Sequence, residues 1–107
     1  MSRLDRISED EWRELALSAQ GSVAVLAGLC GVTRRQLERF MRERWGFVPV
    51  RWLNEVRLRH APTLLEQGLL AKEAAALLGY GSASHFAKAF KDYHGVPPSK
   101  FKAHEPD

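Results

Sequence analysis

The chain has 107 residues, of which 45% are hydrophobic and 27% charged, a balance that is ordinary for a small globular protein of one domain or two small units. No apolar run is long enough to span a membrane, and the N-terminal segment lacks the apolar core of a signal peptide. We therefore expect no membrane partner. A single cysteine excludes an internal disulfide and a zinc site made of cysteines, which is typical of a protein in the reducing cytoplasm.

The formal net charge of +3 is unevenly distributed along the chain. Residues 1–20 carry a net charge of −2, whereas residues 33–46 and residues 71–102 each carry +3. Positive charge that is concentrated in two regions is the pattern expected of a surface that binds a polyanion.

The first half of the chain predicts three helices. Ser8 and Glu11 have the spacing of a capping box at the start of the first helix, and Ser22 can cap the second. Gly31 ends the second helix, and Thr33 can cap a third helix, which is basic.

The second half repeats this plan after a long helix. We expect that helix over residues 49–67, bent at Pro62 because proline lacks the donor of a helical hydrogen bond. Two more helices follow, the second capped by Ser82 or Ser84, and a short helix ends the series. No segment has the period-two alternation of a strand. The sequence therefore predicts an all-α protein of about seven helices.

Two segments share the spacing of a helix-turn-helix unit. In the first, the small residue Ala27 lies four residues before Gly31, and a glycine permits the left-handed backbone of a tight turn between helices. Ala75 and Gly79 repeat that spacing, and the second turn then contains one extra residue. We predict two helix-turn-helix units, residues 8–46 and 70–102, joined by the helix at 49–67.

The two segments also close in a similar way, with RERWGFVPVRW in the first and KDYHGVPPSKF in the second. With these features, residues 8–102 resemble the DNA-binding domain of the AraC/XylS family of bacterial transcription regulators. The most specific part is AAALLGYGSASHFAKAFKDYHGVPPSKFK, and the linker helix carries a matching set of residues: Arg57, Leu58, Ala61, Leu64 and Leu65.

The resemblance implies a sequence-specific transcription regulator that inserts two recognition helices into successive major grooves of double-stranded DNA. The chain is similar to the short, stand-alone members of the family, so we expect it to bind DNA as a monomer. RNA polymerase would be a further partner if the protein is an activator.

The first recognition helix has a basic outer face. The family's base-reading positions correspond to Arg35, Glu38 and Arg39, and the arginine fork suits the O6 and N7 acceptors of guanine. Glu38 could accept from a cytosine amine or pair with a neighbouring arginine, and the sequence leaves both open. Expected phosphate contacts come from Thr33, Arg34 and Arg42.

The second recognition helix offers a poorer reading face. Its candidate base-reading residues are Ala83, Ser84, His85 and Lys88, and its candidate phosphate contacts are Ser82 and Lys91. Serine and alanine make few base-specific contacts, and we expect Lys88 to hold phosphate rather than a base. His85 either donates to DNA or is a solvated surface side chain.

No set of residues suggests catalysis, a metal or a cofactor. Cys30 is expected to pack in the core, and the four histidines share no metal-ligand spacing with it. We therefore expect a protein that is not an enzyme. One alternative function is a protein-interaction module that keeps the helix-turn-helix fold, and another is the DNA-binding part of a partner-controlled regulator. The basic face of residues 33–46 favours DNA.

Overall fold

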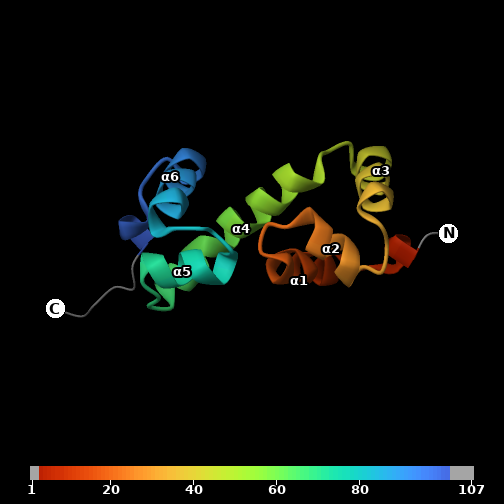
Figure 1. The fold of residues 1–107 in the computed structure, drawn as a ribbon. Coiled ribbons are helices and arrows are strands. Elements are labelled where there is room, and N and C mark those ends of the chain that lie inside the picture. The colour runs from red at the N-terminus through yellow and green to blue at the C-terminus, as the bar shows by residue number, and fades with distance from the viewer. Residues whose placement is uncertain (1–2, 102–107) are drawn as a thin grey trace. The chain divides into compact units, whose positions relative to one another are not determined.

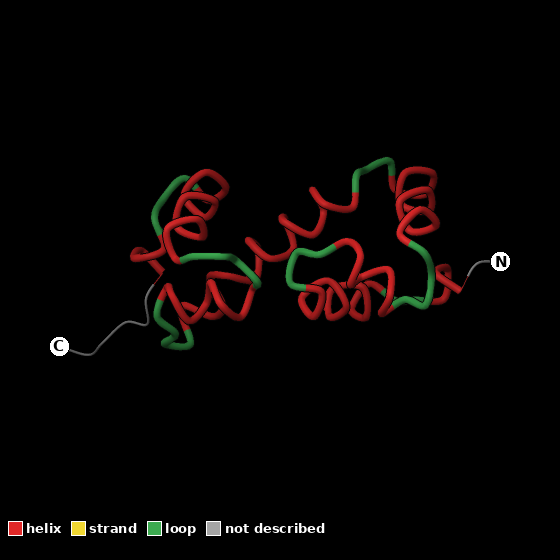
Figure 2. Tube along the Cα trace, in the orientation of Figure 1, coloured by secondary structure: helices red, strands yellow, loops and turns green. Residues whose placement is uncertain are grey.

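The computed structural model describes residues 3–101, and within them every regular element is a helix (Figure 1, Figure 2). The elements are η1 (Arg3–Arg6), α1 (Glu9–Ala19), α2 (Val23–Leu29), α3 (Arg34–Trp45), α4 (Pro49–Glu66), α5 (Ala71–Leu78), α6 (Ala83–His94) and η2 (Pro98–Phe101), where η marks a 3₁₀ helix. The all-α prediction is confirmed. The expected short last helix is the 3₁₀ helix η2, and η1 was not expected.

The chain forms two compact units, and the boundary between them falls after Val56, inside α4. Leu53 and Val56, in the first part of α4, are buried in the core of the first unit. Leu58, Ala61 and Leu65, further along the same helix, are buried and belong to the second unit. The predicted linker helix therefore supplies core residues to both units.

The first unit has an aliphatic core and an aromatic cluster. Its fully buried side chains include Leu26, Leu37, Met41 and Leu53. The aromatic cluster consists of Trp12, Phe40, Trp45, Phe47 and Trp52, and Trp45 lies with its ring centroid 5.1 Å from that of Trp12. Contacts between these rings, of which Trp12 is buried and Trp45 stays exposed, hold the C-terminal end of α3 against α1 and the start of α4.

The second unit packs α5 and η2 against α6. Phe86 and Phe90, one turn apart on α6, are completely buried, and Ala75 of α5 is buried with them. The Phe90 ring lies edge-on to Phe101 of η2, with centroids 5.3 Å apart. Small residues on α5 thus let large rings of α6 fill the space between the helices.

The expected helix starts are confirmed by hydrogen bonds. The Ser8 hydroxyl accepts from the Glu11 N–H at 3.2 Å, and the Glu11 carboxylate accepts from the Ser8 N–H at 3.4 Å. The Ser22 hydroxyl caps α2 by accepting from the Val25 N–H, and Ser82 rather than Ser84 caps α6 by accepting from the His85 N–H. Such caps satisfy N–H groups that the helix itself leaves without an acceptor.

Gly31 and Gly79 have the left-handed backbone that the two turns require, with φ of 72° and 85°. One residue lies between Gly31 and the capping residue Thr33, whereas two lie between Gly79 and Ser82, so the extra residue of the second turn is confirmed. A Cβ at Gly31 would also meet the end of the Arg3 side chain, which is flexible enough to move aside, so the left-handed backbone is the main constraint on this position.

Pro62 lies inside α4, and the helix continues through it to Glu66. A proline in a helix interior lacks a donor and crowds the carbonyl four residues earlier. Burial of the surrounding apolar side chains holds the helix despite that cost. The bend expected at this position stays a prediction.

Candidate nucleic-acid interface

The outer face of α3 carries three arginines with no partner in the described part of the chain. Arg35, Arg39 and Arg42 are exposed, and their side chains form no hydrogen bond or ion pair with another described residue. Leu37 and Met41, on the opposite side of the helix, are completely buried. Because burial of that side fixes the rotation of α3, the three guanidinium groups are held toward solvent.

The other two arginines of this basic region are paired with acids. The Arg34 Nε lies 2.8 Å from the Glu38 carboxylate, one turn along α3. The side chains are 63% and 36% exposed, so the pair contributes little stability. The pair matters because it reduces the positive charge of this face. The sequence left two roles open for Glu38, an ion pair or a contact with cytosine, and this structure contains the ion pair.

The start of α3 is held by a complete capping box. The Thr33 hydroxyl oxygen accepts from the Gln36 N–H at 3.1 Å, and the Gln36 side-chain oxygen accepts from the Thr33 N–H at 2.8 Å. The threonine O–H remains able to donate outward. Together with the positive end of the helix dipole, it suits a phosphate contact.

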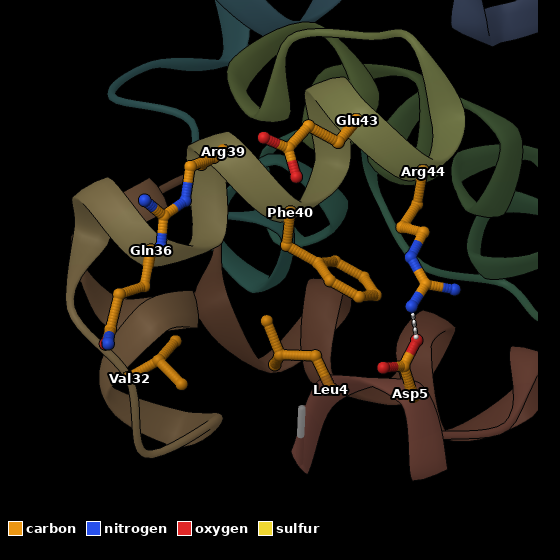
Figure 3. A pocket seen from close by; sticks show the side chains of 8 residues that line it. All are labelled: Leu4, Asp5, Val32, Gln36, Arg39, Phe40, Glu43 and Arg44. Atoms are coloured by element: carbon orange, nitrogen blue, oxygen red, sulfur yellow. Dashed lines mark ion pairs between the residues drawn. The ribbon is translucent and has the colours of Figure 1, made fainter. Parts of the chain in front are cut away.

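The 3₁₀ helix η1, which no sequence pattern predicts, supports the flank of α3. Figure 3 shows Phe40 pointing from α3 toward Leu4, and it marks the ion pair between Asp5 and Arg44. In this pair the Arg44 guanidinium lies 2.9 Å from the Asp5 carboxylate. Arg39 and Gln36 line the same shallow hollow. Asp5 therefore neutralises Arg44, and three of the five arginines between residues 33 and 46 have no acidic partner among residues 3–101.

The outer face of α6 carries smaller and fewer polar groups than the outer face of α3. Its exposed residues include Ala83, Ser84, His85, Lys88 and Lys91. The Ser82 hydroxyl accepts from the His85 N–H at 3.1 Å. The His85 ring stands edge-on to Tyr80, with centroids 5.4 Å apart, so it is partly held by packing. The structure thus keeps the candidate residues of α6 at the surface.

A buried arginine stabilises the turn before α6. Arg57 of α4 is 8% exposed, donates to the Leu78 carbonyl at 3.1 Å, and stacks 4.1 Å from the centre of the Tyr80 ring. Burial raises the pKa of the Tyr80 hydroxyl, and the nearby Arg57 charge opposes that rise. In the sequence, only the family resemblance marks Arg57, because no local pattern pairs it with residue 80.

Cys30 lies in the core of the first unit and is 5% exposed. Burial raises the pKa of its thiol, so the reactive thiolate is disfavoured. No group of three histidine, cysteine or acidic residues that could hold a metal occurs among residues 3–101. None of the helices in this range has the length and apolar character needed to cross a membrane.

Comparison with known proteins gives consistent matches. The model of a helix-turn-helix domain family matches residues 26–104. An uncharacterized HTH-type transcriptional regulator of Haemophilus influenzae is 38% identical over 78 residues, which cover 72% of this chain and 26% of that protein. The chain thus spans about a quarter of the length of the curated relatives it matches first.

Two solved structures share both the fold and part of the sequence. One is a transcriptional regulator of Chromobacterium violaceum with an AraC-type DNA-binding domain, at 27% identity and a TM-score of 0.65, covering 87% of this chain and 90% of that one. The other is the DNA-binding domain of AdpA in complex with a target DNA, at 27% identity and a TM-score of 0.68, covering 86% of each chain.

Proposed function

The chain belongs to the AraC-type helix-turn-helix family of transcription regulators, and on that premise we propose that it binds double-stranded DNA in a sequence-specific manner to regulate transcription. The similarity to the AdpA domain, which was solved with a target DNA, supports this function. The protein-interaction alternative lacks support from the exposed face of α3, which is neither acidic nor apolar.

The observation that carries the proposal is the row of uncompensated arginines on α3. Arg35 and Arg39 are one turn apart, exposed, and without a partner among the described residues. A guanidinium held in this way can donate two parallel hydrogen bonds to the edge of a guanine. Arg42 and the Thr33 hydroxyl are suited to flanking phosphates, which set the register of the helix in the groove.

The second unit contributes mainly to affinity in this account. Lys88 and Lys91 are exposed point charges that attract phosphate with little preference for geometry. Ser84 and Ala83 offer few groups that distinguish one base pair from another. We therefore propose that α6 enters the neighbouring major groove as an anchor.

Two different reading faces on one chain predict an asymmetric site bound by a monomer. Successive major grooves on one side of the duplex are about 34 Å apart, so the site should span about 20 base pairs. Neither half of the site needs to be an inverted copy of the other, because α3 and α6 expose different residues.

Selection from a pool of random duplexes, followed by titration at several salt concentrations, tests the proposal. With about five or six phosphate contacts, log K plotted against log salt should have a slope near −5. Footprinting of the selected duplex should show one protected asymmetric site. An affinity that does not change with salt, or a palindrome bound only by a dimer, would contradict the proposed function.

A further inference from the structure

A hydrogen bond in the second unit joins the end of α6 to the middle of α4. The Nε2 atom of His94, the last residue of α6, lies 2.7 Å from the carbonyl oxygen of Leu58. Because a carbonyl oxygen only accepts, the histidine must donate, and Nε2 carries the proton. The contact links residues that are 36 positions apart in the chain.

Leu58 is the residue whose carbonyl Pro62 leaves without its usual donor. In an α-helix the carbonyl of residue 58 accepts from the N–H of residue 62, and proline has no N–H. Leu58 is 7% exposed, so access of water to replace that donor is restricted. A buried carbonyl without a partner is unfavourable, and the His94 imidazole supplies the missing donor.

The surroundings of His94 hold its ring in place for this contact. Its centroid lies 4.3 Å from that of Phe90 and 4.8 Å from that of Tyr93, and Phe101 lies on the same cluster at 5.7 Å. The Tyr93 hydroxyl in turn accepts from the Arg59 Nε at 3.0 Å. Residues 58 and 59 of α4 therefore each hold the last turn of α6.

We propose that Pro62 and His94 are a matched pair that positions the second recognition helix. The proline exposes a hydrogen-bond acceptor on α4, and the histidine uses it to fix the C-terminal end of α6. The buried ring of Phe86 fixes the other end, so the direction of the helix is set. His94 is thus a positioning residue that acts on DNA only through the orientation of α6.

A double-mutant cycle measured by urea unfolding of the full chain tests the pairing. His94→Phe keeps an aromatic ring and removes the donor, so it should lower the folding equilibrium constant about tenfold. Pro62→Ala restores the helical N–H, and in that background His94→Phe should have an effect below about twofold. His94→Gln, which keeps an N–H donor, should recover part of the loss. Equal losses in both backgrounds would overturn the proposal.

Nitrogen NMR of the histidine rings tests the same bond without any substitution. The His94 ring should be protonated at Nε2, and that proton should exchange slowly with water. In Pro62→Ala the exchange should become faster, because the carbonyl gains a competing donor. A ring protonated at Nδ1 alone, or an Nε2 proton that exchanges rapidly in the native chain, would overturn the proposal even if His94→Phe did not fold.

The effect on DNA rests on the proposed function and is measured separately, on the duplex recovered by selection. His94→Phe should weaken binding, and Pro62→Ala should not reverse that loss, because the double variant still has no donor that holds the end of α6. If the native chain does not bind duplex DNA, the proposed function fails while the unfolding cycle still decides on the pair. A His94→Phe variant that is destabilised but binds as tightly as the native chain would contradict the positioning role.

Discussion

The two recognition helices can be compared position by position, because each is twelve residues long and follows a capping hydroxyl. Thr33 corresponds to Ser82 as the cap, and the buried Leu37 corresponds to Phe86. Each helix is followed by a glycine in the left-handed conformation. The exposed positions differ, since Arg35, Arg39 and Arg42 correspond to Ser84, Lys88 and Lys91.

The two units share their helix caps, helix ends and buried positions, and they differ in their exposed side chains. Caps, stops and buried positions recur because both units must place one helix against another at a tight turn. The exposed side chains are not constrained by that packing, so they can serve different parts of one binding site. We infer that base discrimination is concentrated on α3 and that α6 contributes mostly phosphate contacts.

The largest effects should come from breaking what the two helices share. Leu37→Ala and Phe86→Ala each remove a completely buried side chain and should destabilise the protein by about 3 kcal/mol or more. Urea unfolding measures both. Arg35→Ala and Ser84→Ala, at exposed positions of the same helices, should change stability by less than about 0.5 kcal/mol. If a core variant has the same free energy of unfolding as its exposed control, then the two recognition helices are not packed in the common way described here.

The next effect comes from giving α6 the chemistry of α3. Ser84→Arg places a guanidinium at the position that corresponds to Arg35, and it should create a new base preference of about 1–3 kcal/mol in the second half of the site. Ser84→Lys is the matched control, since it adds charge without the planar fork. Selection from random duplexes measures both. If both variants instead gain the same affinity for every sequence, then an arginine at this position of α6 cannot discriminate between base pairs.

A smaller effect tests the role of Glu38. Glu38→Gln removes a negative charge and releases Arg34, so affinity for every duplex should rise by about two- to fivefold without a change in base preference. Glu43→Gln, an exposed carboxylate on the same helix, controls for charge alone. A change of preference at one base pair would instead show that Glu38 contacts a base.

The smallest effect concerns pH and the second turn alone, because Val32 takes the place of Tyr80 in the first turn. The pKa of Tyr80 is raised in the folded chain, mainly by burial, so the fold favours the protonated hydroxyl. That stabilisation is complete below the ordinary tyrosine pKa of about 10 and is lost as pH rises through the folded value. Urea midpoints measured at neutral pH and above about pH 10 should therefore fall less in Tyr80→Phe than in the native chain. An equal fall in both would contradict the burial effect.

Local signals in the sequence were enough to predict the frame of both units. The capping pair of Ser8 with Glu11 acts over three residues, and the spacing from Ala27 to Gly31 marks a turn directly. The buried side of α3 follows from helical periodicity, which also places Arg35 and Arg39 at the surface. These predictions rest on interactions between neighbours in the chain, so composition and spacing reveal them.

Interactions between residues that are far apart in the chain could not be predicted from the sequence. Asp5 neutralises Arg44 across 39 positions, and no spacing rule connects η1 with α3. Counting charges in residues 33–46 therefore overestimated the number of arginines available to DNA. Pro62 alone predicts a bend, whereas the structure adds the His94 contact that satisfies the Leu58 carbonyl. Such pairs depend on how two helices are packed, which only the fold decides.

The most direct test of the proposed division of labour is a competition assay against single-base variants of the selected duplex. It compares Arg39→Ala with Lys88→Ala, the corresponding change on α6. Arg39→Ala should relax the choice at one or two base pairs, at a cost of about 1–3 kcal/mol in discrimination. Lys88→Ala should weaken binding to all variants by a similar factor and reduce the salt slope by about one. A larger change of base preference with Lys88→Ala than with Arg39→Ala would contradict the account.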